Sequence, residues 1–386
     1  MKSKPRPKRL VIGAMTGTSL DGIDVATAMI QGQGLDMRAK LLLHVTAELG
    51  PLRDELHRAA QQEPMTARQF AGLALALGKR YADTIADAAE PGQPIDLIAV
   101  HGQTIVHRPP VSWQLINPAP IAARFDCPVV YNLRQADIAA GGQGAPITPI
   151  ADWILFRDRL HRRAIVNLGG FCNATILPAA RSGKPLEQVR GFDICACNLV
   201  LDAVARQTLG TPYDQGGGAA QCGAPHAKAV QDLCATFRRR RSEHRSLGTE
   251  DEASDWVAQH KIQLPPNDLA ASAVVAVAEC IGEAIAEHNV DQIIIAGGGA
   301  HNRALVDAID RQCHTPVRLS DALGVPIQAR EALAMAVLGA LCADGIPITL
   351  PQVTGSTEPA PVAGMWCLPH GLLGHHDEDS EPIGPP

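Results

Sequence analysis

Glycine, hydroxyl and carboxylate residues gather in one short segment near the start of the chain. Residues 16–22 read Thr-Gly-Thr-Ser-Leu-Asp-Gly and stand between the apolar residues 11–12 and the mostly apolar run 23–30. Glycine lets a backbone approach an anion closely, hydroxyls add hydrogen-bond donors, and a carboxylate such as Asp21 or Asp24 can hold hydrated Mg²⁺. The segment therefore predicts two strands around a turn that binds a metal-bound polyphosphate. An ordinary hairpin turn is the alternative, since the same residue types favour turns.

A second segment of the same design follows about 150 residues later. Residues 162–178 again read as strand, turn and strand, with Asn167, Gly169 and Gly170 at the turn. A repeat at this scale indicates two domains, each opening with a hairpin whose turn could grip phosphates. The pattern predicts a nucleotide in a cleft between the domains.

A third glycine turn lies late in the chain. Residues 293–296 read as a buried strand that runs into Gly297, Gly298 and Gly299 and then into a helix. A helix that begins after a glycine turn is a ready site for an anion or a nucleotide. The spacing is neither GxGxxG nor GxxxxGK[ST], so it supports neither the dinucleotide-binding fold nor the P-loop.

Polar side chains follow a predicted strand at residues 97–100. His101, Gln103 and Thr104 come directly after it, and ligands of α/β proteins lie where strands end. The alternative is that each side chain only satisfies loop backbone. Arg134 and Asp137 precede a glycine-rich stretch, residues 139–146, which is a candidate hinge between domains or a plain flexible loop.

Asp193 is the strongest candidate for proton transfer. Residues 189–192 resemble the end of a strand and residues 198–209 an amphipathic helix, which predicts that Asp193 lies at a strand-to-helix junction. A carboxylate there is well placed to take a proton from a bound ligand. The alternative is that Asp193 only caps the helix.

Length and composition narrow the classes of function. The 386 residues exceed one typical domain, and 46% hydrophobic with 19% charged residues is ordinary for a globular protein. A net charge of −6 predicts no nucleic-acid partner, and 3% aromatic residues argue against stacking surfaces for sugars or bases. The 10 cysteines include no CxxC pair, which predicts a reduced, cytoplasmic protein. We expect no segment that approaches a membrane span in length and apolar composition.

Taken together, the segments resemble the anhydro-N-acetylmuramic acid kinase family over roughly residues 10–371. The resemblance rests on nine blocks in the same order, which are GAMTGTSLDGIDVA, HGQTIVHRP, LRQADIAAGGQGAP, NLGGFCNAT, GFD, GTPYDQGG, AGGGAHN, EALAMA and LPQVTG. It implies an α/β fold of the actin/sugar-kinase/Hsp70 type, with two domains and an interdomain cleft. We expect the domains at residues 1–138 and 139–372, and a disordered tail at 373–386.

The resemblance also implies an activity. Kinases of this family use ATP and Mg²⁺ to cleave the 1,6-anhydro bond of the amino sugar and to phosphorylate O6, in the recycling of peptidoglycan. We therefore expect ATP and a small amino sugar as partners, with no nucleic acid or membrane, and a homodimer is left open.

Site residues follow from the matching motifs. Asp193 in GFD would activate the attacking water as general base. The phosphates would meet one turn formed by Gly17, Thr18, Ser19, Leu20, Asp21, Gly22, Ile23 and Asp24, with Asp21 or Asp24 near Mg²⁺, and a second turn formed by Asn167, Gly169 and Gly170. Gly297, Gly298 and Gly299 would lie near the nucleoside. The sugar would meet His101, Gln103, Thr104, Arg134, Asp137 and Glu331.

The chain departs from the family pattern beside the predicted base. Where the family has Thr-Gly-Pro-Gly after the aspartate, residues 194–197 read Ile-Cys-Ala-Cys, and the family's Asp-Phe-Arg is replaced at residues 132–134 by Asn-Leu-Arg. Two alternatives stay open. One is an ordinary sugar kinase in which Asp193 deprotonates a hydroxyl, and the other is a nucleotide-binding homologue that has lost turnover.

Overall fold

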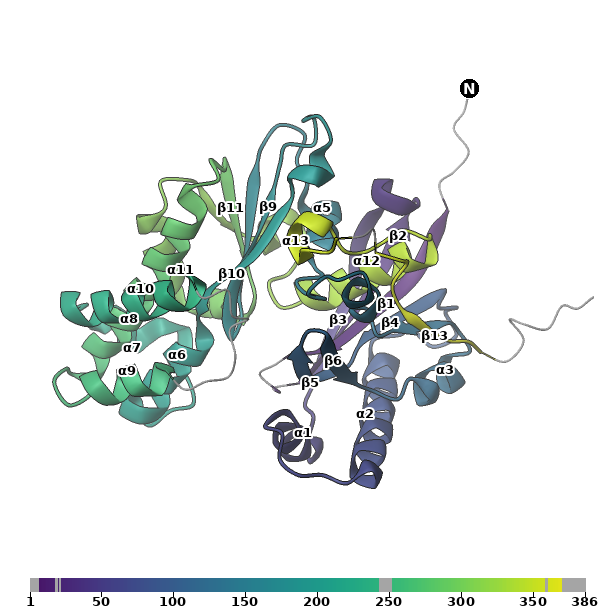
Figure 1. Cartoon of the computed structure of the whole chain (residues 1–386), viewed down its shortest axis with the longest axis horizontal. Helices are drawn as coiled ribbons and strands as arrows, with labels where there is room; N and C mark the ends of the chain where they lie inside the picture. Colours follow the sequence, from purple (N-terminus) through teal and green to yellow (C-terminus); the bar gives the residue numbers. More distant parts are fainter. Residues whose placement is uncertain (1–6, 18–19, 21, 243–251, 358–359, 370–386) are drawn as a thin grey trace, which may run out of the picture. The chain divides into compact units, whose positions relative to one another are not determined.

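The chain folds into two compact units, which Figure 1 shows in a computed structural model. The structure describes residues 7–17, 20, 22–242, 252–357 and 360–369. The first unit contains the described residues up to Ala136, Met335–Ile346, and those from Val362 onward, and the second contains Asp137–Ala334 and Pro347–Pro361. The tail expected at 373–386 lies outside the described residues, as do Thr18, Ser19 and Asp21.

The late helix α12 (Arg330–Ala343) explains why the units differ from the predicted domains. The sequence predicts all of 139–372 in the second domain, but the helix starts in the second unit and continues in the first. Its Gly339 packs so closely on the first sheet that a Cβ there would come within 2.5 Å of the Ala99 Cβ. This long-range contact, which no local pattern reveals, assigns residues 335–346 to the first unit.

The first unit is a six-stranded sheet with helices on both faces. Its order is β13-β7-β4-β1-β2-β3, in which β1, β2 and β3 are antiparallel neighbours and β4 runs parallel to β1 and β7. The strands are β1 (Lys8–Thr16), β2 (Ile23–Gln31), β3 (Arg38–Ala47), β4 (Leu97–His101), β7 (Val129–Tyr131) and β13 (Met365–Cys367), and β5 (Gln103–Arg108) pairs with β6 (Val111–Leu115) separately. Apart from α12, the helices of this unit are α1 (Leu52–Ala60), α2 (Ala67–Asp87), α3 (Ala119–Phe125) and α4 (Gln135–Ala139). The last residues of α4 belong to the second unit.

Helix α2 forms because its sequence supplies both a start signal and an apolar stripe. Thr66 and Gln69 make a capping box at its N-terminus. Leu73, Leu77 and Tyr81 are buried at intervals of four residues, which places them on one face. That face packs on Ile98 and Val100 of β4, whereas the alternating Ala99 faces Gly339 of α12.

The second unit repeats the strand order of the first. Its sheet runs β10-β9-β8-β11-β12, with an antiparallel β8–β9–β10 meander and β11 parallel to β8 and β12. The strands are β8 (Arg163–Leu168), β9 (Phe171–Leu177), β10 (Arg190–Ala196), β11 (Gln292–Ala296) and β12 (Val317–Leu319). This order matches β3-β2-β1-β4-β7, so the predicted internal repeat and the α/β, actin-like class are confirmed. The cleft between the domains stays a prediction.

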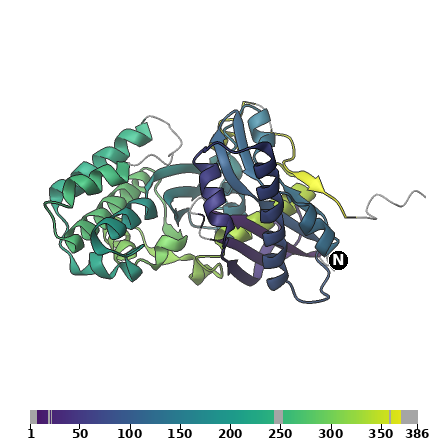
Figure 2. The same ribbon diagram turned by 90° about the horizontal axis from the view of Figure 1, so that it is seen from below.

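Helices of the second unit gather on one flank of its sheet, where Figure 2 shows them in teal and green. Those on the core side are α6 (Asn198–Val204), α7 (Gly218–Cys222), α8 (Ala227–Ser242), α9 (Glu252–His260), α10 (Pro266–Ala286) and α11 (Arg303–Gln312), and α5 (Pro149–Phe156) and α13 (Pro351–Thr354) complete the unit. Among the described residues, α10 alone is long and apolar enough to cross a membrane by length and composition, contrary to our expectation that no segment would be. Because 72% of its apolar window is buried inside the unit, α10 serves as a core helix.

Gly78 of α2 offers a test of this packing. A Cβ at Gly78 would lie 2.0 Å from the carbonyl oxygen of Asn117, whereas a Cβ at Gly72 in the same helix meets nothing within 4 Å. We expect Gly78→Ala to lower the free energy of unfolding by about 1–3 kcal/mol through overpacking. Gly72→Ala should raise it by about 0.5–1 kcal/mol through helix propensity. Urea denaturation measures both, and equal effects of the two changes would contradict the packing.

Candidate active site

The opening turn lies at the end of the β1–β2 hairpin, as predicted. Thr16 pairs with Ile23 across the hairpin, and the amide of Leu20 donates to the carbonyl oxygen of Gly17 at 3.3 Å. Leu20 is buried with φ at 56°, a left-handed conformation that holds the turn tightly. A Cβ at Gly22 would come within 2.9 Å of the carbonyl oxygen of Ala47, so the chain requires glycine there.

Asp24, one of the two predicted Mg²⁺ ligands, is held by the neighbouring strand. The Thr46 hydroxyl donates to its Oδ1 at 2.6 Å, and His44 Nε2 lies 3.2 Å from the same oxygen. Mg²⁺ in phosphate sites is commonly held by one or two carboxylates together with substrate phosphates, so a single anchored carboxylate fits the ion. Among the described residues, no three His, Cys, Asp or Glu side chains form a metal site of their own.

The cluster after β4 is built around Arg134. Its Nε and Nη2 donate to Nε2 of His101 at 3.4 and 3.3 Å, which places the His101 proton on Nδ1. Burial, with the charge of Arg134, lowers the pKa of His101 well below its ordinary value. The same two causes lower the pKa of His107 to about 4. Both rings are therefore neutral at pH 7, and the guanidinium supplies the positive charge of the cluster.

The predicted sugar contacts on this strand are mostly buried. His101 is 5% exposed and Gln103 is 1% exposed, while Thr104 is half-buried on β5. His101 Nδ1 and Gln103 Oε1 are buried without a hydrogen-bond partner in the described structure. His101 therefore orients Arg134, whereas the Gln103 amide donates to the carbonyl oxygen of Thr104 at 3.3 Å. Direct contact of these side chains with a sugar stays a prediction.

The second hairpin turn docks on the start of α6. The carbonyl of Gly169 accepts the amide of Asn198 at 3.0 Å, and the carbonyl of Gly170 accepts the amide of Cys197 at 2.9 Å. At the end of β8, the buried Asn167 donates through Nδ2 to Oε1 of Glu331 at 3.4 Å. The structure therefore joins the second predicted phosphate turn to a predicted sugar contact from 164 residues further along the chain.

The third glycine turn packs directly on the second. A Cβ at Gly297 would lie 2.8 Å from both Asn167 Oδ1 and the Leu168 carbonyl oxygen. A Cβ at Gly299 would lie 2.7 Å from Asn198 Oδ1, whereas Gly298 meets nothing within 4 Å. Two of the three glycines are needed for close backbone approach, and the middle one faces open space.

That space is a cavity of about 490 Å³ within the second unit. Its size suits a small organic ligand. Of its lining residues, the sequence predicts only Gly298 and Gly299 as site residues, although the GTPYDQGG and AGGGAHN blocks contain six more of them. The lining residues are Asn198, Leu201, Asp202, Tyr213, Asp214, Gln215, Gly216, Gly298, Gly299, His301, Asn302 and Gln328.

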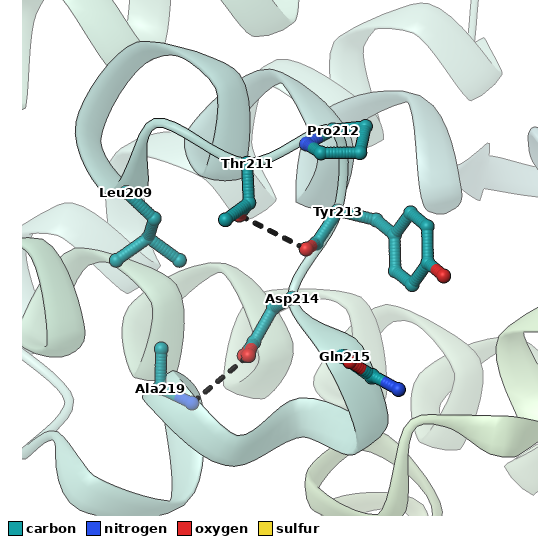
Figure 3. A pocket seen from close by; sticks show the side chains of 7 residues that line it. All are labelled: Leu209, Thr211, Pro212, Tyr213, Asp214, Gln215 and Ala219. Carbon is teal, nitrogen blue, oxygen red and sulfur yellow. Dashed lines mark hydrogen bonds between the residues drawn. The ribbon is translucent and has the colours of Figure 1, made fainter.

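A neighbouring cavity of about 400 Å³ shares Tyr213, Asp214 and Gln215 with the first, and Figure 3 shows its lining. Asp214 accepts the amides of Ala219 and Ala220 at 2.9 and 3.0 Å, and so caps the short helix α7. Asp214 therefore fixes the loop between the cavities, a structural task that occupies both of its oxygens.

Asp193 lies within a strand, which corrects the predicted junction. Strand β10 continues to Ala196 because Ile194 and Cys195 are apolar and buried. Asp193 pairs with Asn173 of β9 and is exposed, and a β-bulge separates it from Cys195. A bulge re-aims side chains and is common next to active sites. Since α6 begins only at Asn198, Asp193 is no helix cap.

The unusual cysteines beside Asp193 belong to the core. Cys195 and Cys197 are 1% and 0% exposed in the main apolar cluster of the second unit. Burial raises the pKa of Cys197 to about 12, so it stays a thiol. Both therefore pack as small apolar residues, which disfavours a metal or redox role for this pair.

Asp137, a predicted sugar contact, holds the glycine-rich loop. Thr354 Oγ1 donates to its Oδ1 and the amide of Gly144 to its Oδ2, each at 2.7 Å. A Cβ at Gly142 would lie 2.2 Å from Oδ2, so the loop closes on the carboxylate only because that residue is glycine. Asp137 is buried and is the first residue of the second unit.

A buried ion pair that sequence reasoning missed anchors the start of α12. Arg330 and Asp152 are 1% and 0% exposed at the side chain. Arg330 donates through Nε to Asp152 Oδ1 at 2.9 Å and through Nη2 to Oδ2, which also accepts from Thr175 Oγ1 at 2.8 Å. The pair fixes Arg330, which directly precedes Glu331 in α12. It therefore also positions Glu331 for its hydrogen bond with Asn167.

Comparison with known proteins identifies the family. The model of the family described as anhydro-N-acetylmuramic acid kinase matches residues 9–366. This chain belongs to that family. Membership implies that the chain uses a nucleotide. The anhydro-N-acetylmuramic acid kinases of Salinibacter ruber and Picosynechococcus sp. are 34% and 35% identical to it, over 93% and 92% of this chain and 96% and 99% of theirs.

Solved structures with a similar fold include a sugar kinase at low sequence identity. A ROK family glucokinase from Streptomyces griseus, in complex with glucose and AMPPNP, is 14% identical with a TM-score of 0.40. The match covers 86% of this chain and 99% of that one.

The Arg330–Asp152 pair predicts a large stability effect. Arg330→Met leaves a buried carboxylate without its partner, which should cost about 3–5 kcal/mol. The control is Arg124→Met, which breaks the Arg124–Asp83 pair, whose side chains are 45% and 61% exposed. That change should cost about 1 kcal/mol or less. Urea denaturation of both variants checks the difference, and similar costs would contradict the role of the buried pair.

Proposed function

We propose that this chain is an ATP-dependent kinase that opens the 1,6-anhydro ring of 1,6-anhydro-N-acetylmuramic acid by hydrolysis and phosphorylates O6. The product is N-acetylmuramic acid 6-phosphate, which enters peptidoglycan recycling and amino-sugar breakdown. The observation that carries the proposal is the family match over residues 9–366. The exposed Asp193 at a β-bulge supports it, because ring opening by water needs such a carboxylate.

Asp193 acts as the general base in this mechanism. Its carboxylate takes one proton from a water molecule, whose oxygen forms a bond to the anomeric carbon. The bond from that carbon to O6 breaks, and its electron pair stays on O6. O6 then forms a bond to the γ-phosphorus of ATP, ADP leaves, and Asp193 returns its proton to solvent. The water thus becomes the anomeric hydroxyl of the product.

Nucleotide binding is divided among the three glycine turns. The turn from Gly17 to Asp24 and the turn of Asn167, Gly169 and Gly170 bind phosphates, and Gly297–Gly299 with the adjoining cavity of about 490 Å³ binds the nucleoside. When bound through Asp24 or Asp21, Mg²⁺ neutralises the charge that develops on the transferred phosphoryl group. The protein's own contribution is position and hydrogen-bond donors.

The sugar site includes the charged Arg134. Muramic acid carries a carboxylate, and a guanidinium oriented by His101 suits such a group. Glu331, held beside Asn167, completes the proposed contacts. The ten free cysteines favour a reducing, cytoplasmic compartment, and the oligomeric state stays a prediction.

Product mass tests the reaction directly. With ATP, Mg²⁺ and the anhydro sugar in ¹⁸O-labelled water, we expect a product that gains phosphate plus one water, with the label at the anomeric position. Phosphate gain without water would instead support an ordinary sugar kinase. Nucleotide binding without any product would support a homologue that has lost turnover.

Asp193→Asn tests the base. The amide cannot accept the proton of water, so turnover should fall by about 10²–10⁴-fold. Nucleotide affinity should stay within about twofold, because the proposed role concerns water alone. Steady-state kinetics and calorimetric titration with ATP measure the two effects. The control Glu187→Gln removes one charge from an exposed ion pair of the same unit and should change neither. Wild-type turnover in Asp193→Asn would remove Asp193 from the mechanism.

A further inference from the structure

Two strand ends that carry predicted site residues lie side by side in the first unit. Strands β1 and β4 are parallel neighbours, and Met15 is in register with His101. Thr16, the last residue of β1, directly precedes the proposed phosphate turn. His101, the last residue of β4, orients Arg134. The relative position of these two ends therefore sets the distance between the phosphate turn and the guanidinium.

Tyr81 of α2 connects the two ends through one hydroxyl. Its oxygen lies 2.9 Å from the carbonyl oxygen of His101 and 3.1 Å from Oγ1 of Thr16. The carbonyl can only accept, so the phenol proton is directed to His101, and the Thr16 hydroxyl can donate to the phenol oxygen. Burial raises the pKa of Tyr81 well above its ordinary value, so the hydroxyl keeps its proton.

Packing alone does not require this hydroxyl. Tyr81 is fully buried in the apolar cluster with Leu77 and Ile85, where a phenylalanine ring would fill the same volume. Burying a hydroxyl carries a desolvation cost that only well-placed partners offset. The partners here are the last residues of the two strands that lead into the proposed site.

We propose that Tyr81 is a positioning residue, whose hydroxyl holds the ends of β1 and β4 in the arrangement that binds the β- and γ-phosphates of ATP. The inference rests on the proposed function for the assignment of residues 17–24 as a phosphate turn. Phosphoryl transfer depends mainly on placement and charge neutralisation. A small shift of Thr16 therefore weakens binding of the triphosphate without disturbing the nucleoside cavity of the second unit.

Tyr81→Phe tests the inference by removing the hydroxyl and keeping the ring. We expect the Kd for ATP with Mg²⁺ to rise about five- to tenfold, as for the loss of one hydrogen bond. The Kd for AMP, which lacks the β- and γ-phosphates, should change less than about twofold, since the nucleoside cavity is untouched. In the sugar assay, kcat should fall at least about tenfold. Isothermal titration calorimetry with each nucleotide measures the first two effects.

Two controls separate positioning from general destabilisation. Tyr131→Phe removes a hydroxyl from a half-buried tyrosine of the same unit. Ile85→Val trims the same buried face of α2 one turn beyond Tyr81. Both should keep the wild-type preference for ATP over AMP, even where the melting temperature falls as far as in Tyr81→Phe. An equal loss of ATP and AMP affinity in Tyr81→Phe, or an unchanged ATP affinity, overturns the inference.

Thr16 tests the other end of the connection. Thr16→Val should weaken ATP binding as Tyr81→Phe does, while Thr16→Ser, which keeps the hydroxyl, should restore nearly wild-type binding. The double variant that combines Tyr81→Phe with Thr16→Val should be no worse than either single variant, because both changes remove the same connection. Additive losses of ATP affinity in the double variant would contradict the proposed connection through Tyr81. These titrations need no sugar, so they decide the role of Tyr81 even if the wild-type chain fails to open the anhydro ring.

Discussion

The proposed site depends on one parallel strand pairing in each sheet, which is β1 with β4 in the first unit and β8 with β11 in the second. In the first unit it brings the end of β1 beside His101, and in the second it places Asn167 in register with Ala296, next to Gly297. Carboxyl ends of parallel strands lie at the same edge of a sheet, so residues distant in sequence become neighbours there. The duplicated strand order applies this constraint twice, which explains why the polar turns recur after corresponding strands.

Each unit also holds one element of its proposed site with a buried polar contact. Tyr81 connects the ends of β1 and β4 in the first unit through neutral hydrogen bonds, and Arg330 with Asp152 anchors the start of α12 in the second through a buried ion pair. Such groups are costly to bury unless every partner is well placed. These polar contacts fix the relative position of the groups that they join, because a hydrogen bond weakens with small shifts that an apolar contact tolerates. Both contacts lie one or two residues from groups proposed to bind phosphate or sugar.

Local chemistry explains how much of the molecule was predictable from sequence. Glycine turns between apolar segments predicted both hairpins, and the buried strand before Gly297 predicted the third turn. The Arg330–Asp152 pair joins residues 178 apart, and the cavity draws on four separated segments, so neither leaves a periodic pattern. Residues 335–346 belong to the first unit because of tertiary contacts, which a local sequence pattern likewise does not reveal. The end of β10 differs from the prediction because aspartate and alanine are depleted in strands, whereas the burial of Ile194 and Cys195 extends the strand past Asp193.

The same burial bears on whether the residues after Asp193 impair the base. The family pattern has glycines there, which allow a loop to bend, whereas this chain inserts Cys195 and Cys197 into the apolar core. Cys195 of β10 pairs with Cys172 of β9, and Cys197 donates its amide to the Gly170 carbonyl of the second phosphate turn. Packing and hydrogen bonds thus hold the backbone on the C-terminal side of the bulge, where glycine would leave it freer. Cysteines in place of these glycines hold the backbone after Asp193 by packing in the apolar core. The Asp193 carboxylate itself stays exposed to water.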